Sequence, residues 1–220
     1  MDGRKKGPDM KFEKKDHKYY VNGRRVVSVT ECLPSPPPQL KYMAAFIAKT
    51  ELGRKVHDEV DKLNVLIMRS GIPSSKALTK IAEQCKEDRV RDYFSGYVEF
   101  VKQYKPKILA SETALYHPRF GYAGTLDILM EVKSKRWLTD VKNTAKLEPY
   151  VALQLAGYID LWNINNPSIP VHERSVIHLL GNGGFEWVRN YKVANLARDM
   201  NVFKAKLVST SWDVQNGVEK

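Results

Sequence analysis

The chain has 220 residues, of which 43% are hydrophobic and 28% charged, and its formal net charge is +11. This composition indicates one soluble globular domain, and no apolar run approaches the length of a membrane span, which excludes an integral membrane protein. The positive charge favours a polyanionic partner such as nucleic acid, although acidic proteins and anionic lipid would also satisfy it.

The two cysteines, Cys32 and Cys85, are too few for the four thiolates of a zinc or iron–sulfur site, or for a disulfide framework. We interpret both as small, buried apolar residues of a protein in a reducing cytosol. The charged N-terminus is followed by no apolar region, so we expect no secretory signal.

The first 38 residues predict an arm, a hairpin and a connector. Residues 1–10 are polar and basic, which is typical of a loose arm. Residues 17–27 predict a hairpin, because strand-forming residues flank Asn22 and Gly23, which accept the positive φ angles of a type I′ turn.

A short helix is predicted after this hairpin. Ser28 or Thr30 can cap it with a side-chain oxygen, and the proline-rich stretch at 34–38 must end it. That stretch is either a stiff connector or a recognition segment, and we interpret it as a connector.

A helical part is predicted from 39 to 105. Within 39–64, apolar residues recur at helical spacing: Leu40, Met43, Ala44, Ile47, Leu52, Val56, Val60 and Leu63. Helical patterns return over 75–88 and 90–104, and the sequence at 72–75 is typical of a loop and cap that open the first of these.

The part from 106 to 208 predicts a sheet with helices. Its expected elements are strands over 107–116, 122–131 and 136–142, a helix over 149–162, a hairpin formed by 175–180 and 185–191, and a closing helix from 193 to about 207. The fold class that this order predicts is α/β, with a mixed central β-sheet flanked by helices. We expect residues 1–220 to form a single domain.

Two acidic residues and a lysine carry the predicted chemistry. Alternation along a strand places Asp140 and Lys142 on one side of it. Asp127 lies 13 residues before Asp140, in the preceding predicted strand, and a short turn at 133–135 would make the two carboxylates neighbours. The faces of the earlier strand are expected to be Leu126, Ile128 and Met130 on one side and Thr125, Asp127 and Leu129 on the other.

Neighbouring carboxylates repel each other, and a hard divalent cation with oxygen ligands relieves that repulsion. Such a cation can activate water and stabilise phosphoryl charge, while Lys142 orients the water or stabilises the developing charge. The alternative is a strand with a salt bridge on a wet face, since one D-x-K tripeptide is common by chance.

The combined pattern Gly124-x-x-Asp127, Asp140-x-Lys142 and Gln154-x-x-x-Tyr158 resembles the PD-(D/E)xK nuclease superfamily, and within it the RecB-like and phage-type exonuclease branch. The resemblance covers roughly residues 50–208. It implies a restriction-endonuclease-like fold and phosphodiester hydrolysis that depends on Mg²⁺ or Mn²⁺.

By the same resemblance, Asp127, Asp140 and the backbone carbonyl of Val141 are metal ligands, and Lys142 is the catalytic lysine. His57, in the segment Gly53-Arg54-Lys55-Val56-His57, resembles the G-x-x-x-H motif that adds a nitrogen ligand. A nitrogen ligand would make Mn²⁺ a better fit. The alternative is a hydrogen bond from His57 to a nearby carboxylate such as Asp61.

Three further candidates follow from the resemblance. Gln154 and Tyr158 share a helix face and are expected beside the site and the DNA backbone, or else form a polar helix side with a half-buried tyrosine. Glu112, one strand before Asp127, is expected near a metal ion or the attacking water, or else is a surface glutamate.

Two hydroxyls near the N-terminus are candidates for DNA binding from capping chemistry alone. Ser28 and Thr30 stand at a helix start, where a terminal phosphate can bind. Tyr19 could stack on unpaired bases, although packing is the better interpretation of this aromatic residue.

The predicted function is a DNA exonuclease that acts on linear or single-stranded ends in phage or bacterial recombination, repair or end processing. We expect it in the cytoplasm of a bacterium or of a phage-infected host. The chain has no helicase P-loop and no iron–sulfur cysteines, so it would act alone or with a recombination or helicase partner. The alternatives are a structure-selective endonuclease of the same fold and a non-catalytic DNA-binding subunit.

Overall fold

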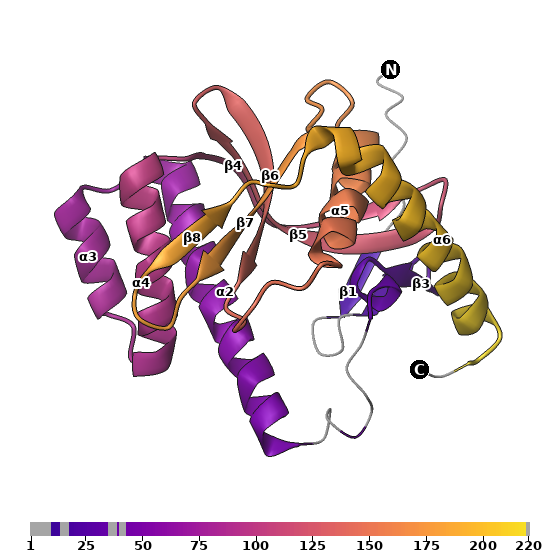
Figure 1. Ribbon diagram of the computed structural model, residues 1–220, viewed down its shortest axis with the longest axis horizontal. Coiled ribbons are helices and arrows are strands. Elements are labelled where there is room, and N and C mark those ends of the chain that lie inside the picture. Colours follow the sequence, from indigo (N-terminus) through magenta and orange to yellow (C-terminus); the bar gives the residue numbers. More distant parts are fainter. Residues whose placement is uncertain (1–9, 14–17, 35–38, 40–42, 219–220) are drawn as a thin grey trace.

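A computed structural model describes residues 10–13, 18–34, 39 and 43–218 (Figure 1). The predicted N-terminal arm up to residue 9, the start of the predicted hairpin at His17, and the prolines at 36–38 lie outside these residues. None of the helices that the structure describes is long and apolar enough to cross a membrane.

Eight strands in the described part of the chain form one mixed sheet. They are β1 (Met10–Glu13), β2 (Lys18–Val21), β3 (Arg24–Ser28), β4 (Lys107–His117), β5 (Tyr122–Val132), β6 (Lys135–Lys142), β7 (Glu173–Leu179) and β8 (Phe185–Val188). Their order is β1-β2-β3-β5-β6-β7-β8, and β4 pairs with β5. The pairs β3–β5 and β6–β7 are parallel and the others antiparallel, which confirms the predicted mixed sheet.

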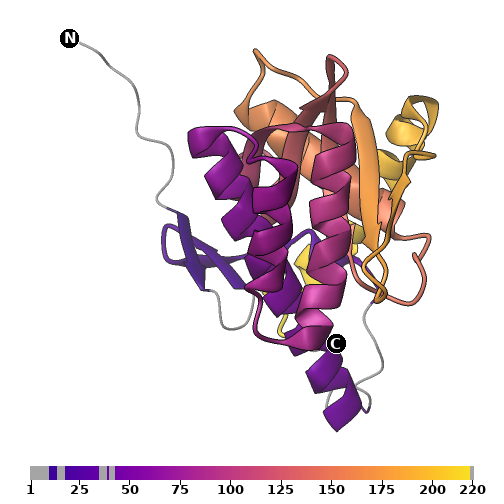
Figure 2. The same cartoon turned by 90° about the vertical axis from the view of Figure 1, so that its left-hand side faces the viewer.

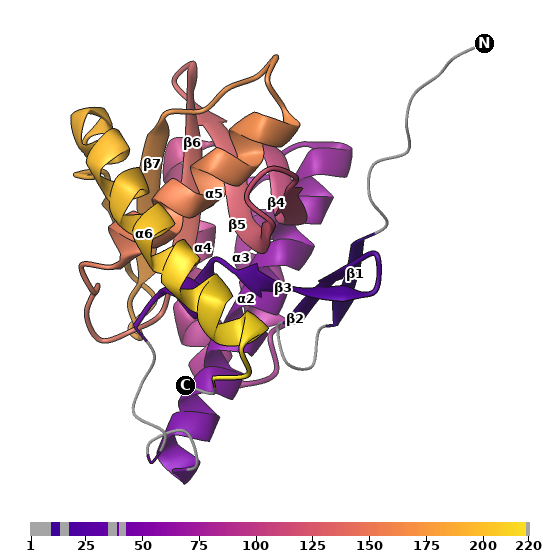
Figure 3. The same cartoon turned by 90° about the vertical axis from the view of Figure 1, so that its right-hand side faces the viewer.

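Helices cover both faces of this sheet (Figures 2 and 3). On one face lie α2 (Ala44–Ser70), α3 (Ser75–Glu83) and α4 (Asp88–Tyr104), and on the other lie α5 (Val151–Asn165) and α6 (Leu196–Gln215). Short 3-10 turns, η1 (Thr30–Cys32) and η2 (Val193–Asn195), precede the proline-rich stretch and α6. Each face has its own apolar core, one built around α2 and α4 and the other around α5 and α6.

Local turn chemistry explains the two hairpins beside the predicted site. Asn22 and Gly23 have φ angles of 52° and 74°, as predicted for the turn between β2 and β3. Lys133 and Ser134, with φ angles of 50° and 61°, form the two-residue turn between β5 and β6, because Val132 pairs with Lys135.

The helical part differs from its prediction in detail. α2 continues beyond residue 64 to Ser70, and Gly71 ends it with a φ of 78°. Met43 and Ile47, expected in the helix's apolar stripe, are 51% and 52% exposed. The first turns of α2 extend past the sheet, as Figures 1 and 2 show, so these side chains have no core to enter.

The boundaries of three other helices also differ from their predictions. The predicted helix over 75–88 ends at Glu83, and α4 begins at Asp88. The Ser74 side chain accepts a hydrogen bond from the Ala77 backbone, which confirms the predicted cap. The closing helix, expected to end near 207, continues to Gln215 because Phe203, Leu207 and Thr210 remain buried against the body of the protein.

The sheet forks at β5, and this fork positions the site. β4 pairs along one edge of β5, while the other edge pairs with β6 over residues 128–132 and with β3 at Tyr122 and Ala123. Between them, residues 124–127 pair with no strand on that edge among the strands that the structure describes.

Side-chain alternation along β5 breaks at this fork. Leu126 packs in the core of α5 and α6, whereas Ile128 and Met130 pack in the core of α2 and α4. The prediction that these three residues share one face is therefore wrong. A regular strand would alternate throughout, but β5 changes its partner strand at Asp127, and Glu112 in the neighbouring strand has a positive φ of 41°.

Candidate metal centre

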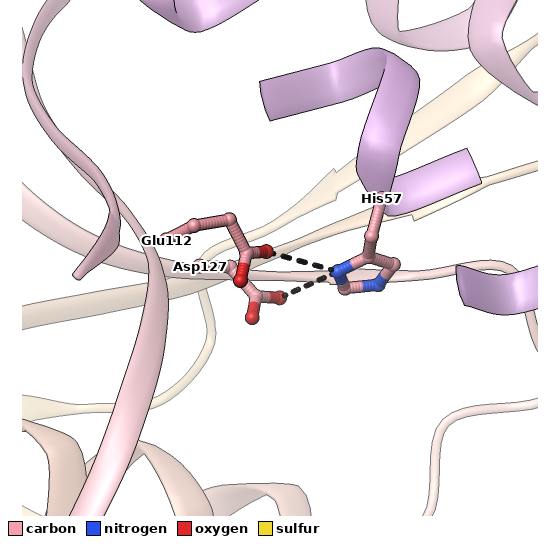
Figure 4. Close-up of side chains that lie close together, drawn as sticks. All are labelled: His57, Glu112 and Asp127. Carbon is pink, nitrogen blue, oxygen red and sulfur yellow. Dashed lines mark ion pairs between the residues drawn. The ribbon is translucent and has the colours of Figure 1, made fainter. Parts of the chain in front are cut away.

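Three side chains from three elements converge at the fork (Figure 4). Nδ1 of His57, on α2, lies 3.6 Å from Oε1 of Glu112, on β4, and 3.7 Å from Oδ2 of Asp127, on β5. One ligand atom from each of the three lies within 4.8 Å of the others. The sequence predicted each of these residues, and the structure brings them together.

Packing sets the direction of each side chain. Val56 and Val60 are buried in the core, and this anchors α2 with His57 facing the sheet. Glu112 stands across from Asp127, because the flanking residues of β4 and β5 pair in register. Its side chain is 38% exposed and that of Asp127 13%, so the cluster opens toward solvent from the β4 side.

Asp127 also accepts a hydrogen bond from the main chain of β6. The backbone N–H of Val141 donates to Oδ2 of Asp127 at 2.8 Å. The β5–β6 ladder ends one step earlier, at Ile128 and Thr139, so the carboxylate takes the place of a backbone acceptor. This contact joins Asp127 to the strand that carries the D-x-K residues.

Asp140 and Lys142 form a buried ion pair beside this contact. Nζ of Lys142 lies 3.1 Å from Oδ1 of Asp140 and 2.8 Å from Oδ2. The Asp140 side chain is 2% exposed, and its Oδ2 has no hydrogen-bond partner among the residues that the structure describes. A buried carboxylate oxygen therefore keeps acceptor capacity at the fork.

The second nitrogen of His57 meets the residue between Asp140 and Lys142. Nε2 lies 3.0 Å from the carbonyl oxygen of Val141, to which an Nε2–H donates. Such a bond orients the ring, as backbone carbonyls do for metal-binding histidines. The Val141 carbonyl therefore faces Nε2 and not Nδ1, the nitrogen that meets Glu112 and Asp127, and its predicted role as a metal ligand stays a prediction.

Asp61 is not the partner of His57. It accepts a hydrogen bond of 2.6 Å from the hydroxyl of Ser111 instead. The alternative of a local helix pair is therefore wrong, because β4 lies closer to Asp61 than the imidazole does and supplies a hydroxyl donor.

The charges of the cluster perturb one another. Burial lowers the pKa of His57, but the negative charges of Asp127 and Glu112 outweigh it and raise the pKa to about 9. Burial and the neighbouring carboxylate Glu112 raise the pKa of Asp127. Burial, with the charge of Asp127, raises the pKa of Asp140 to about 6 despite the ammonium of Lys142. The three carboxylates of Glu112, Asp127 and Asp140 thus outnumber the two positive charges of His57 and Lys142 beside them.

These residues fit a divalent cation. Two atoms each about 2.1 Å from one cation lie roughly 3–4 Å apart, which matches the separations of His57 Nδ1 from Glu112 and Asp127. Asp140 is not among the three residues whose ligand atoms lie within 4.8 Å of one another, and its Oδ2 lies 2.8 Å from Nζ of Lys142, so its role as a ligand stays a prediction. Hard carboxylate oxygens suit Mg²⁺, and the imidazole makes Mn²⁺ the better fit.

Gln154 and Tyr158 lie beside the carboxylates but within the core. They are 6% and 5% exposed, and Nε2 of Gln154 donates to the Tyr158 hydroxyl at 3.4 Å. Burial and the charges of Asp127 and Asp140 raise the pKa of Tyr158. The absence of a side chain at Gly124 leaves room for the Tyr158 ring, because a Cβ at residue 124 would lie 2.8 Å from that ring. Their contact with DNA stays a prediction.

Ser28 precedes Val29, the N-cap of the 3-10 turn η1 that stands where a short helix was predicted, and it pairs with Glu31 through two hydrogen bonds. Its hydroxyl accepts from the backbone N–H of Glu31, and its own backbone N–H donates to the Glu31 carboxylate. Ser28 is 1% exposed, and Thr30 contacts its hydroxyl at 3.1 Å. A DNA phosphate would have to displace the Glu31 carboxylate to reach Ser28, so the contact of these two hydroxyls with DNA stays a prediction.

Tyr19 is the residue near the site whose position the sequence did not predict. It is 4% exposed, so packing rather than base stacking is the correct interpretation. Its hydroxyl lies 3.0 Å from Oγ1 of Thr125, and burial with the charges of Glu112 and Asp127 raises its pKa. Alternation in β2 was the available signal, since Tyr19 and Val21 are both buried.

A hollow of about 620 Å³ lies away from this cluster, between α2, α3 and α4. Charged side chains such as Arg54, Asp58 and Lys62 line it, and none of the cluster residues does. Cys85 borders the hollow and is only partly buried, unlike Cys32, so the prediction of a buried thiol holds for Cys32 alone.

Comparisons with known proteins find little. No family model and no curated protein matches the chain. Among solved structures, the crystal structure of SSO0001 is similar over 81% of this chain and 75% of its own, with 12% sequence identity and a TM-score of 0.29. A TM-score this low identifies neither a fold family nor a function.

Proposed function

We propose that the chain is a divalent-metal-dependent DNA nuclease of the PD-(D/E)xK superfamily, with a restriction-endonuclease-like core. The observation that carries the proposal is the convergence of His57, Glu112 and Asp127 at the fork, where β6 supplies Asp140 and Lys142. A surface salt bridge, the plain alternative for Asp140 and Lys142, would not need two further acidic residues and a histidine around it.

Each residue has a role in this proposal. His57, Glu112, Asp127 and Asp140 hold the cation. When bound, the cation would activate a water and neutralise charge on the phosphate. Lys142 keeps its proton, because the charges of Asp140 and Asp127 outweigh burial and raise its pKa. Its ammonium can therefore stabilise the charge that develops on the phosphate.

DNA is the proposed substrate because a formal charge of +11 favours a polyanion and the resemblance is to DNA nucleases. More specifically, we propose an exonuclease that acts on DNA ends in recombination or repair. Its place of action would be the cytoplasm of a bacterium or of a phage-infected host. This part of the proposal is supported by the resemblance to the RecB-like and phage-type branch.

The test is cleavage of end-labelled linear DNA and of a closed circle with Mg²⁺, Mn²⁺ or EDTA. Lys142→Ala should abolish cleavage. The control Lys135→Ala, on the same strand but paired at the surface with Glu173, should not. Metal-dependent loss of the linear DNA alone supports the exonuclease, and cleavage of the circle indicates the endonuclease. DNA binding without cleavage under any metal contradicts the enzyme and favours a binding subunit.

A further inference from the structure

A chain of hydrogen bonds, buried at Tyr97 and Asn64 and partly buried at Ser111 and Asp61, links α4, α2 and β4 next to Glu112. The Tyr97 hydroxyl donates to Oδ1 of Asn64. Nδ2 of Asn64 donates to the Ser111 hydroxyl at 3.1 Å, and that hydroxyl donates to Oδ1 of Asp61 at 2.6 Å. Asn64 and Tyr97 are both 0% exposed, and a buried polar chain of this kind is costly unless every member is paired.

The donor and the acceptor of each of these three hydrogen bonds are fixed. Burial raises the pKa of Tyr97, so its hydroxyl remains protonated and donates. This bond occupies Oδ1 of Asn64 and leaves Nδ2 to face Ser111. The Ser111 hydroxyl then donates its hydrogen bond to the Asp61 carboxylate. The hydroxyl of Ser111 is therefore held from two sides by α2.

The residue after Ser111 has a strained backbone. Glu112 has a φ of 41°, in the left-handed region that residues other than glycine rarely adopt. β4 pairs only with β5 among the described strands, so no second strand fixes its outer edge. The contacts of Ser111 with α2 supply that restraint next to the strained residue.

The same helix face carries a predicted metal ligand and the two restraints. His57, Asp61 and Asn64 stand at i, i+4 and i+7 on α2, and therefore along one stripe. α2 thus carries His57, and through Asp61 and Asn64 it also contacts β4, the strand that carries Glu112. These contacts lie next to the pair formed by Nδ1 of His57 and Oε1 of Glu112, which are 3.6 Å apart.

We propose that Ser111 and Asn64, supported by Tyr97, are positioning residues that hold Glu112 within reach of a cation at the His57–Asp127 cluster. This inference rests on the metal centre of the proposed function. It does not rest on DNA hydrolysis, because binding of Mn²⁺ alone tests it.

The experiment is calorimetric titration of the full chain with Mn²⁺. Ser111→Ala should weaken Mn²⁺ binding by about tenfold, the lower end of the effect of outer contacts on metal affinity. Glu112→Gln should weaken it at least as much. The double variant should bind no more weakly than Glu112→Gln, because Ser111 acts through Glu112. Ser111→Thr, which keeps the hydroxyl, should restore binding.

A matched pair of variants separates positioning from general loss of stability. Tyr97→Phe removes one buried phenol hydroxyl from the chain and should weaken Mn²⁺ binding. Tyr122→Phe removes another, bonded to Asp160 and the Gly157 carbonyl at 3.0 and 3.2 Å, and should leave Mn²⁺ binding unchanged.

Several results would overturn the inference. The first is an equal loss of Mn²⁺ affinity in Tyr97→Phe and Tyr122→Phe. The second is a loss of Mn²⁺ affinity from Ser111→Ala that is the same in the wild type and in Glu112→Gln. The third is a wild-type protein that does not bind Mn²⁺. DNA that stays intact while the Ser111–Glu112 coupling holds would support the inference and count against the nuclease proposal alone.

Discussion

The backbone N–H of Val141 donates a hydrogen bond of 2.8 Å to the side chain of Asp127 and not to a backbone carbonyl. The antiparallel ladder of β5 and β6 stops at Ile128 and Thr139, and in the same register Asp127 would face Asp140. β5 turns away there to pair with β3, and the carboxylate fills the vacated acceptor position. Asp127 is thus both a structural acceptor and a candidate metal ligand.

Asp127→Asn separates these two roles. The amide oxygen still accepts from Val141, while a buried negative charge disappears from a position where burial and Glu112 raise the pKa of the carboxyl. We expect the melting temperature in EDTA to rise and DNA cleavage to fall by at least about 100-fold. Calorimetry and the cleavage assay check this. A less stable variant that still cleaves DNA would contradict it.

Metal binding should release a proton from His57. The negative charges of Asp127 and Glu112 outweigh burial and hold its pKa at about 9, so the ring is charged at pH 7.5 in the metal-free protein. A ligating ring must be neutral, and Mn²⁺ affinity should therefore increase with pH up to about 9. Titration in buffers of different ionisation enthalpy measures the release, which His57→Gln should remove. Equal heats in all buffers for the wild type would contradict this.

The same shift predicts how the stability of the metal-free protein depends on pH. A raised histidine pKa contributes stability that is complete below the ordinary value of 6.5 and lost as the pH rises through about 9. Melting temperatures in EDTA should therefore fall across this interval, and less steeply for His57→Gln. If the melting temperatures of the two proteins fall equally steeply with pH, His57 does not carry this charge.

Gly124→Ala should disturb the core above the site. Its Cβ would lie 2.8 Å from the Tyr158 ring, 3.0 Å from Val29 and 3.1 Å from Leu161, and overpacking of this kind costs about 1–3 kcal/mol. Urea unfolding measures the loss. In Gly53→Ala, the new Cβ meets only the Asn143 side chain at 3.4 Å or beyond, so the free energy of unfolding should not fall. Equal losses in both variants would refute this packing argument.

The ion pair between Arg174 and Asp199 should be essential for attaching α6. Nη2 of Arg174 lies 2.6 Å from Oδ2 of Asp199, and these side chains are 0% and 8% exposed. Asp199→Ala leaves a buried guanidinium without its carboxylate and should cost about 3–5 kcal/mol in urea unfolding. The double variant Arg174→Met/Asp199→Leu should be more stable than Asp199→Ala. A double variant at least as unstable as the single one would show that the unpaired charge is not the cause.

Local patterns predicted the part of the site that depends on neighbours in the sequence. Alternation in β6 places Asp140 and Lys142 together, and the two-residue turn at Lys133 and Ser134 brings β5 alongside. That turn predicts only that Asp127 lies near Asp140. The mixed sheet with flanking helices was predictable from the order of the elements for the same reason.

The other features of the site depend on contacts between residues far apart in the sequence. The fork depends on β3, far away in the sequence, and no local signal marks the change of partner at Asp127. Nothing in the sequence predicts a positive φ at Glu112, because glutamate rarely adopts one. Helical spacing made Asp61 an alternative partner for His57, but Asp61 accepts from the Ser111 hydroxyl on β4.

Anomalous scattering of Mn²⁺ in crystals of the full chain would locate the metal centre. We expect one strong peak at the sheet fork, within coordination distance of His57, Asp127 and Asp140 and with Glu112 on its open side. A bound Mn²⁺ elsewhere, or an empty fork at a concentration that saturates Mn²⁺ binding in solution, would contradict the metal centre.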